Sequence, residues 1–69
     1  MAFPDNLKQL RKEYKVTQIE LAQAIGVNDR NIRRYEKGET EPTLSVLTAM
    51  ADYFRCSVDY ITGRTDSRA

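Results

Sequence analysis

Two helix-start signals, eleven residues apart, constrain the fold of this 69-residue chain more than any other feature. Thr17 is followed three residues later by Glu20, the spacing of a capping box, in which each side chain bonds to the other residue's backbone. Asn28 is a second preferred cap, and Gly26 just before it suits a left-handed turn. The sequence therefore predicts two short helices joined by a tight corner.

The second of these helices has two faces of opposite character. It begins after Asn28 and is expected to stop at Gly38, a residue that readily adopts the left-handed conformation. At about 100° per residue, Ile32 and Tyr35 fall on one side of the helix. A cationic stripe falls on the other side and consists of Arg30, Arg33, Arg34 and Lys37.

An ordinary solvated face is the alternative explanation of the cationic stripe, because charged side chains usually lie outside. Asp29 and Arg33 also form a favourable pair four residues apart. Four cations beside one acid nevertheless exceed what solvation requires, and three of the four are arginines. Because the planar guanidinium group matches phosphate and the guanine edge, the stripe indicates nucleic-acid binding.

Three segments carry a family resemblance: LKQLRKEYKVTQIELAQAIGV, YEKGETEPTL and SVDYITG. The positions that match as a set are Gln18, Ala22, Gly26, Ile32, Glu36 and Gly38. From about residue 7 to 63 the chain resembles the Cro and lambda-type repressor family of Xre-type helix-turn-helix domains. The resemblance implies an all-α fold, a compact five-helix lambda-repressor-like domain with its helix-turn-helix core at about residues 17–38.

The resemblance also implies which side chains contact the major groove of double-stranded DNA. The candidates are Arg11, Gln18, Asn28, Asp29, Arg30, Arg33, Arg34 and Lys37. Gln18 matches a position that contacts phosphate or an adenine edge, at a helix start that itself favours anions. Arg30 and Arg34 are the best candidates for bidentate contacts to guanine, whereas Arg33 and Lys37 lie toward the DNA backbone.

Three features of this chain leave alternatives open. Asp29 stands where well-known relatives carry glutamine, and it either accepts from a cytosine amino group or only favours the helix start. Arg11 and Glu36 match a pair that bonds in some relatives, but they could equally be independent surface charges. Acidic residues in the loop after Gly38 make a direct phosphate clamp there doubtful; these are Glu39 and Glu41.

Length and composition favour one small non-enzymatic domain. At 69 residues, only about 60% of the unfolded surface can be buried, so a catalytic cavity beside the core is not expected. The chain has one cysteine, Cys56, and no histidine, so we expect neither a disulfide nor a metal or cofactor site. Cys56 is expected to pack beside Ile61. Without a membrane-spanning run or a signal-peptide core, a cytoplasmic location is expected.

Charge is unevenly distributed although its sum is only +1. Residues 1–38 hold eight Lys or Arg against five Asp or Glu, and residues 39–69 hold three against five. The first half is therefore net positive and the second net negative. A domain of this kind can present its positive end to phosphates without a high overall charge.

Supporting helices are predicted on both sides of the core motif, within a single domain over residues 1–69. The first runs from about Asp5 to Tyr14, with Leu7, Leu10 and Tyr14 inside. A fourth helix follows a Thr43 cap, and its expected inward residues are Leu44, Leu47, Met50, Ala51 and Phe54. A fifth spans residues 58 to about 62, and residues 64–69 form a polar tail expected to fray.

The function that the resemblance implies is transcription regulation, with repression by a homodimer on a pseudo-palindromic operator and recognition helices about 34 Å apart. Candidates for the dimer surface are Val46, Tyr53, Val58, Tyr60 and Ile61, although tyrosines beside a small core often only pack. The alternative is a protein-interaction module on the same fold, such as an antitoxin or anti-repressor. Such a module has no need for the cationic stripe.

Overall fold

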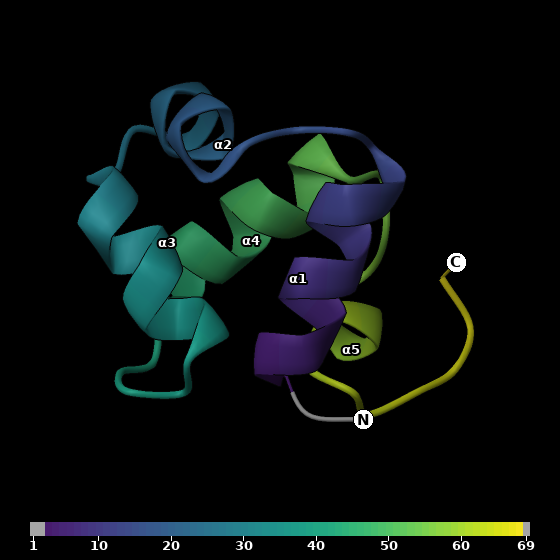
Figure 1. Cartoon of the computed structure of the whole chain (residues 1–69). Coiled ribbons are helices and arrows are strands. Elements are labelled where there is room, and N and C mark those ends of the chain that lie inside the picture. Colours follow the sequence, from purple (N-terminus) through teal and green to yellow (C-terminus); the bar gives the residue numbers. More distant parts are fainter. Residues whose placement is uncertain (1–2, 69) are drawn as a thin grey trace.

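The protein is an arrangement of five short α-helices, seen here in a computed structural model that describes residues 3–68 (Figure 1). The helices are α1 (Phe3–Glu13), α2 (Gln18–Ile25), α3 (Asp29–Glu36), α4 (Leu44–Tyr53) and α5 (Val58–Ile61). No strand occurs among the described residues. The predicted all-α, five-helix fold is therefore confirmed.

The predicted start of α2 is formed by reciprocal bonds. The Thr17 hydroxyl oxygen accepts from the backbone N–H of Glu20 at 3.0 Å, and the Thr17 backbone N–H donates to the Glu20 carboxylate at 2.8 Å. Gly26 ends the helix with a φ of 75°. The next cap follows at once, because the Asn28 side-chain oxygen accepts from the Arg30 N–H at 2.8 Å. The capping box and the tight corner are thus confirmed.

The end of α3 is a Schellman motif centred on Gly38. Gly38 has a φ of 74° and donates to the Tyr35 carbonyl at 3.1 Å, while Glu39 donates to the Arg34 carbonyl at 2.9 Å. These two bonds satisfy carbonyl groups that a helix end otherwise leaves unpaired. The predicted stop at Gly38 is confirmed, and it fixes where the chain leaves α3.

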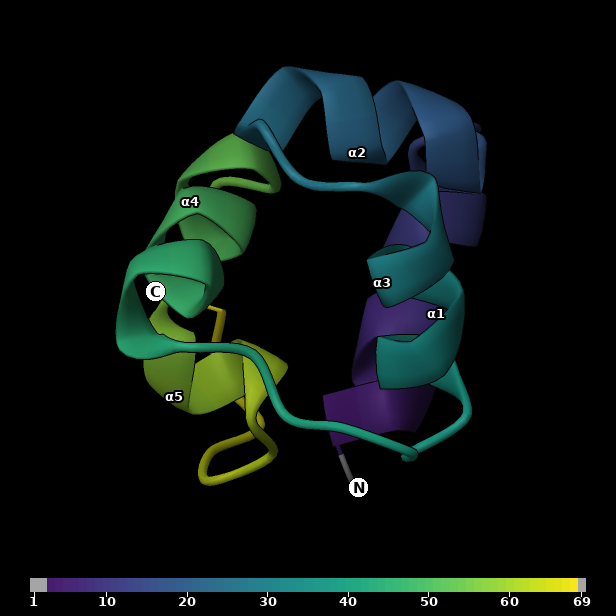
Figure 2. The same cartoon turned by 90° about the vertical axis from the view of Figure 1, so that its left-hand side faces the viewer.

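All five helices contribute to one apolar core. Its fully buried large side chains are Leu7, Leu10, Leu21, Ile32, Met50, Phe54 and Ile61. Figure 2 shows α2 across the top, with α1 and α3 on one side and α4 and α5 on the other. Because α3 packs against α1 and α2 only along its inner face, its outer face remains exposed.

Two residues predicted to lie in the core are largely exposed. Tyr14 is 44% exposed because α1 ends at Glu13 and the chain turns through a left-handed Lys15 with a φ of 55°. The Tyr14 hydroxyl still donates to the Phe54 carbonyl at 2.8 Å. Leu44 is 72% exposed because it opens α4, one turn beyond the side chains that face inward.

The tail is polar as predicted, and its described part, residues 64–68, folds back onto the domain; residue 69 lies outside the described residues. The Arg68 carbonyl accepts from the Ser57 N–H at 3.0 Å, at the start of α5. Arg68 also reaches the Glu13 carboxylate with N···O distances of 2.7 and 2.8 Å. These contacts bring the chain after α5 back to the end of α1.

A buried amide that the sequence did not reveal joins α5 to α1. The Asn6 side-chain nitrogen donates to the carbonyls of Tyr60 at 3.1 Å and Ile61 at 3.4 Å. Because α5 has only four residues, its last carbonyls need partners from outside the helix.

None of the five described helices has the length and apolarity needed to cross a membrane.

Candidate nucleic-acid interface

The outer face of α3 carries the cationic stripe that the sequence predicts. Arg30, Arg33, Arg34 and Lys37 are exposed. Ile32, Tyr35 and Glu36 are buried on the opposite side of the same helix. The buried side thus holds α3 against the domain, and the opposite side presents four cations to solvent.

Two arginines of the cationic stripe have acidic neighbours. An Arg33 guanidinium nitrogen lies 3.1 Å from a carboxylate oxygen of Asp29, which confirms the pair four residues apart. Arg34 lies 3.9 Å from Glu39 of the following loop. Both pairs are about half-exposed, so water and salt weaken them, and the longer Arg34 contact is the one that an anionic ligand can replace. Among the described residues, Arg30 and Lys37 make no ion pair.

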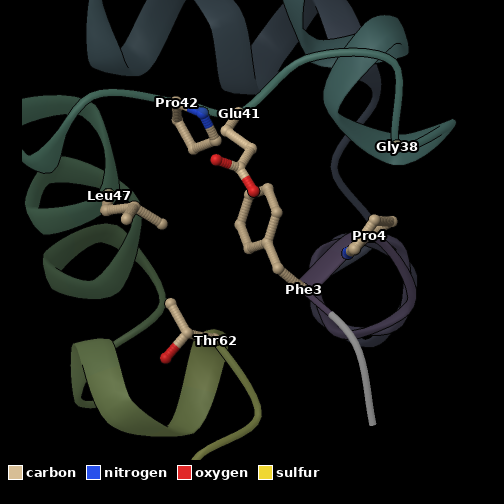
Figure 3. A pocket seen from close by; sticks show the side chains of 7 residues that line it. All are labelled: Phe3, Pro4, Gly38, Glu41, Pro42, Leu47 and Thr62. Atoms are coloured by element: carbon tan, nitrogen blue, oxygen red, sulfur yellow. The ribbon is translucent and has the colours of Figure 1, made fainter.

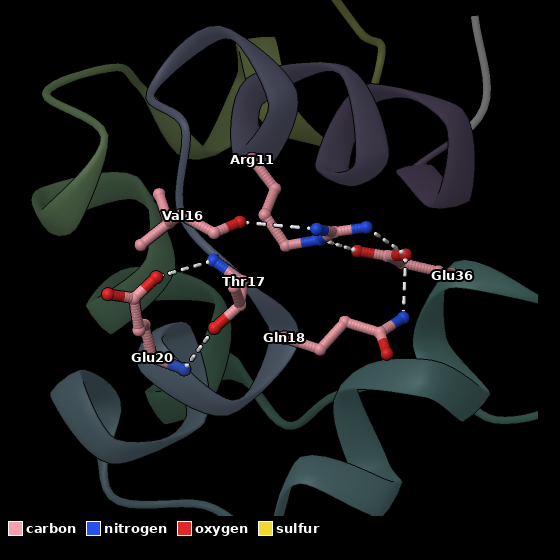
Figure 4. A network of polar contacts seen from close by, with 6 residues as sticks. All are labelled: Arg11, Val16, Thr17, Gln18, Glu20 and Glu36. Atoms are coloured by element: carbon pink, nitrogen blue, oxygen red, sulfur yellow. Dashed lines mark hydrogen bonds and ion pairs between the residues drawn. The ribbon is translucent and has the colours of Figure 1, made fainter.

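The inner end of α3 is fixed by a buried carboxylate (Figure 4). Arg11 approaches Glu36 with two guanidinium nitrogens, at 2.7 and 3.1 Å, in a bidentate arrangement. A third guanidinium nitrogen donates to the Val16 carbonyl at 3.1 Å. The Arg11 and Glu36 side chains are 18% and 5% exposed. Of the two alternatives left by the sequence, the structure has the bonded pair.

Gln18 joins the same carboxylate. Its side-chain nitrogen donates to Glu36 at 3.1 Å (Figure 4), so Glu36 accepts from α1 through Arg11 and from α2 through Gln18. The sequence placed Gln18 at the DNA surface but did not reveal this bond. A single carboxylate thus ties the first two helices to α3 and fixes the orientation of the cationic stripe.

These bonds divide the predicted DNA-contacting residues into two groups. Arg30, Arg33, Arg34 and Lys37 project outward, with Asn28 and Asp29 at the start of the same helix. Arg11 and Gln18 instead bond to Glu36 inside the helix-turn-helix unit. The geometry gives Arg11 a positioning role, and its direct contact with DNA stays a prediction.

A groove with a cavity of about 520 Å³ (Figure 3) has no residue of the cationic stripe in its lining. Its lining residues are Phe3, Pro4, Gly38, Glu41, Pro42, Leu47 and Thr62. Glu41 is the sole ionisable side chain among them, so the lining offers no acid–base pair, and the Thr62 hydroxyl donates to the Val58 carbonyl. Over the described residues, no group of three His, Cys, Asp or Glu side chains could hold a metal ion.

Cys56 is half-buried and packs against the hydrophobic core, as predicted. Burial raises the pKa of its thiol above the ordinary value, and the nearby positive charge of Arg68 offsets this only in part. The thiol is therefore the dominant form at neutral pH. This describes a packing residue, not a reactive nucleophile.

Comparison with known proteins identifies a family. A helix-turn-helix family model matches residues 7–61. The uncharacterized HTH-type transcriptional regulator YobD of Bacillus subtilis (strain 168) is 42% identical over 60 residues, which cover 87% of this chain and 54% of YobD. The cryptic phage CTXphi transcriptional repressor RstR of Vibrio cholerae is 34% identical over 64 residues, covering 93% of this chain and 57% of RstR. This chain therefore spans about half the length of these curated relatives.

A solved structure agrees with the sequence matches. The c2 repressor of Salmonella phage P22, crystallised in complex with a synthetic operator, superposes with a TM-score of 0.84 at 31% identity. The match covers 88% of this chain and 92% of that one. The likeness therefore extends over most of the chain.

Proposed function

The chain belongs to the Xre-type helix-turn-helix family of Cro and lambda-type repressors, and from this membership we propose that it is a sequence-specific DNA-binding transcriptional regulator that acts as a repressor. The observation that carries the proposal is the cationic stripe on the outer face of α3, held at a fixed angle by Glu36. A module that only binds other proteins does not require that stripe. The cytoplasm is the proposed location.

In the proposed complex α3 lies in the major groove, with its first turn toward the base edges. Arg30 and Arg34 take the guanine-reading positions, because each guanidinium group can donate twice to the O6 and N7 atoms of guanine. Lys37 lies near the end of the helix and contacts phosphate as a point charge. In the free protein Arg34 lies 3.9 Å from Glu39, and in the proposed complex it leaves Glu39 and contacts DNA.

Selection of bound sequences from a random DNA pool tests this proposal. Affinity should fall steeply with salt, by about 0.9 log units per neutralised phosphate for each log unit of salt, because bound cations displace counterions. Arg30→Ala and Arg34→Ala should each cost about 1 to 3 kcal/mol on the selected site and relax the preference at one base position. The matched variant Lys37→Ala should weaken binding to all sequences more evenly.

Two results would reject parts of the proposal. Failure of the wild-type protein to bind any sequence at low salt would reject DNA binding and favour the protein-interaction alternative. Unchanged base preference in both arginine variants would reject the assigned base contacts while leaving DNA binding intact.

We further propose that two copies bind a pseudo-palindromic site, with little association in free solution. A single small domain makes too few base contacts for a high specificity ratio, and two recognition helices one DNA turn apart double them. Ile61 is fully buried and drops out of the candidate dimer surface, whereas Tyr53 is exposed. Val46, Val58 and Tyr60 are partly buried.

Gel shifts on one half-site and on the paired site test the dimer, together with sedimentation of the free protein. Binding should be cooperative on the paired site, because DNA raises the effective concentration of the second copy. Equal affinity per half-site in both probes would contradict the dimer. A tight dimer without DNA would contradict only the weak free association.

A further inference from the structure

Asp29 is an acidic residue beside the cationic stripe, on the face of α3 that is proposed to bind DNA. It opens α3, and its carboxylate lies 3.1 Å from the guanidinium group of Arg33, in the midst of the cationic stripe. We infer that Asp29 is a specificity-determining residue that holds Arg33 over the first turn of α3 and so makes it a reader of guanine. The inference rests on the proposed function, since it assumes that α3 binds in the major groove.

Helix geometry gives the pair its direction. Side chains on an α-helix lean toward its amino terminus, so residues four apart meet over the earlier turn. The bond to Asp29 therefore keeps the Arg33 guanidinium group over the first turn, the part of a recognition helix that faces base edges. Without that bond, the long Arg33 side chain is free to follow the phosphate backbone.

The donor count of arginine allows both contacts at once. Asp29 accepts from one terminal nitrogen of Arg33. A guanidinium group has five N–H donors, so an edge with two donors remains for the O6 and N7 atoms of guanine. The carboxylate thus selects an orientation of Arg33 without occupying the donors that read the base.

Stability alone does not explain an acid at this position. The Arg33 and Asp29 side chains are 51% and 40% exposed, and exposed pairs of this kind contribute little to folding. The start of α3 already has its cap in Asn28. A negative charge on the face that meets phosphate weakens binding to every DNA sequence. An acid in the first turn gains a small favourable interaction with the helix start, and improved discrimination between sequences adds to what offsets that general cost.

The test compares base preference and general affinity in four purified proteins: wild type, Asp29→Ala, Arg33→Ala and the double variant. Sites are selected from a random pool, and affinity is also measured on random-sequence DNA. Asp29→Ala and Arg33→Ala should lose preference at the same base position, by roughly 5- to 150-fold, and the double variant should lose no more than either. On random DNA, Asp29→Ala should bind more tightly than wild type and Arg33→Ala less tightly.

Asp29→Ser serves as a second variant, because serine suits the first turn of a helix but cannot hold a guanidinium group as an acid does. It should behave like Asp29→Ala. Loss of preference at two different positions, with additive losses in the double variant, would overturn the inference and show that Asp29 reads its own base, such as cytosine. Unchanged preference in both Asp29 variants would also overturn it. Failure of the proposed function is distinguishable, because the wild-type protein itself would then select no sequence.

Discussion

Two arginine–glutamate pairs in this small domain have the same closest N···O distance of 2.7 Å, yet their surroundings differ. The Arg11 and Glu36 side chains are 18% and 5% exposed, whereas those of Arg68 and Glu13 are 47% and 32% exposed. The first pair joins α1 to α3 of the helix-turn-helix unit, and the second attaches the tail to the end of α1. Distance alone therefore does not rank the two pairs; burial and the number of further bonds do.

The buried pair costs more to disrupt because its groups have little access to water, which could otherwise replace a lost partner. Glu36 accepts from two nitrogens of Arg11 and from the side-chain nitrogen of Gln18, so removal of Glu36 leaves three donor nitrogens without this acceptor. At the exposed pair, water can replace either partner. Arg68 additionally lies over the Tyr60 ring, at 5.2 Å from its centroid, which supports the tail from the other side.

The largest expected effect is that of Glu36→Ala. Loss of the shared carboxylate should lower the free energy of unfolding by about 3 kcal/mol or more, because the Arg11 guanidinium group is left half-buried without its partner. Affinity for DNA should also fall, since α3 then loses its side-chain bonds to α1 and α2. Urea denaturation and gel shifts on the selected site measure the two quantities.

Gln18→Ala is the matched control for that prediction. It removes only one hydrogen bond to Glu36 and leaves Arg11 paired, so it should cost about 1 kcal/mol. A loss of stability as large as that of Glu36→Ala would show that the amide, not the ion pair, joins the helices.

Local contacts and contacts between distant segments differ in whether the sequence predicts them. Thr17, Asn28 and Gly38 act on backbone groups within a few residues, so their roles follow from spacing. The cationic stripe follows from helical periodicity for the same reason. These local signals are sufficient for the helix-turn-helix unit and for its outward face.

Contacts between distant segments do not follow from local spacing or helical periodicity. The Gln18 bond to Glu36 and the Arg68 bond to Glu13 depend on how helices are placed in space, across 18 and 55 residues of chain. Leu44 was wrongly placed in the core because periodicity shows which face a residue shares but not how far along the helix the core extends. Whether Arg11 and Glu36 bond to each other depends on the packing of α1 against α3, which the sequence does not specify.

The smallest expected effect is that of Arg68→Ala, which removes the more exposed of the two arginine–glutamate pairs. The Arg68 side chain, through its bond to Glu13, lowers the pKa of that carboxyl below its ordinary value. A depressed folded-state pKa means that the pair stabilises the fold above the unfolded-state pKa and that this contribution disappears as the pH falls through the folded-state pKa. Wild type and Arg68→Ala should therefore differ slightly in unfolding free energy at neutral pH and converge in acid.

Carboxyl chemical shifts followed by NMR across the acid range should show a higher Glu13 pKa in Arg68→Ala than in wild type. High salt should reduce the small stability difference at neutral pH, because the pair is exposed and its charges are screened. The Glu36→Ala effect should persist in the same salt, since that carboxylate is buried. Should Arg68→Ala destabilise the protein as much as Glu36→Ala, the tail would be an integral part of the fold, and burial would not be what distinguishes the two pairs.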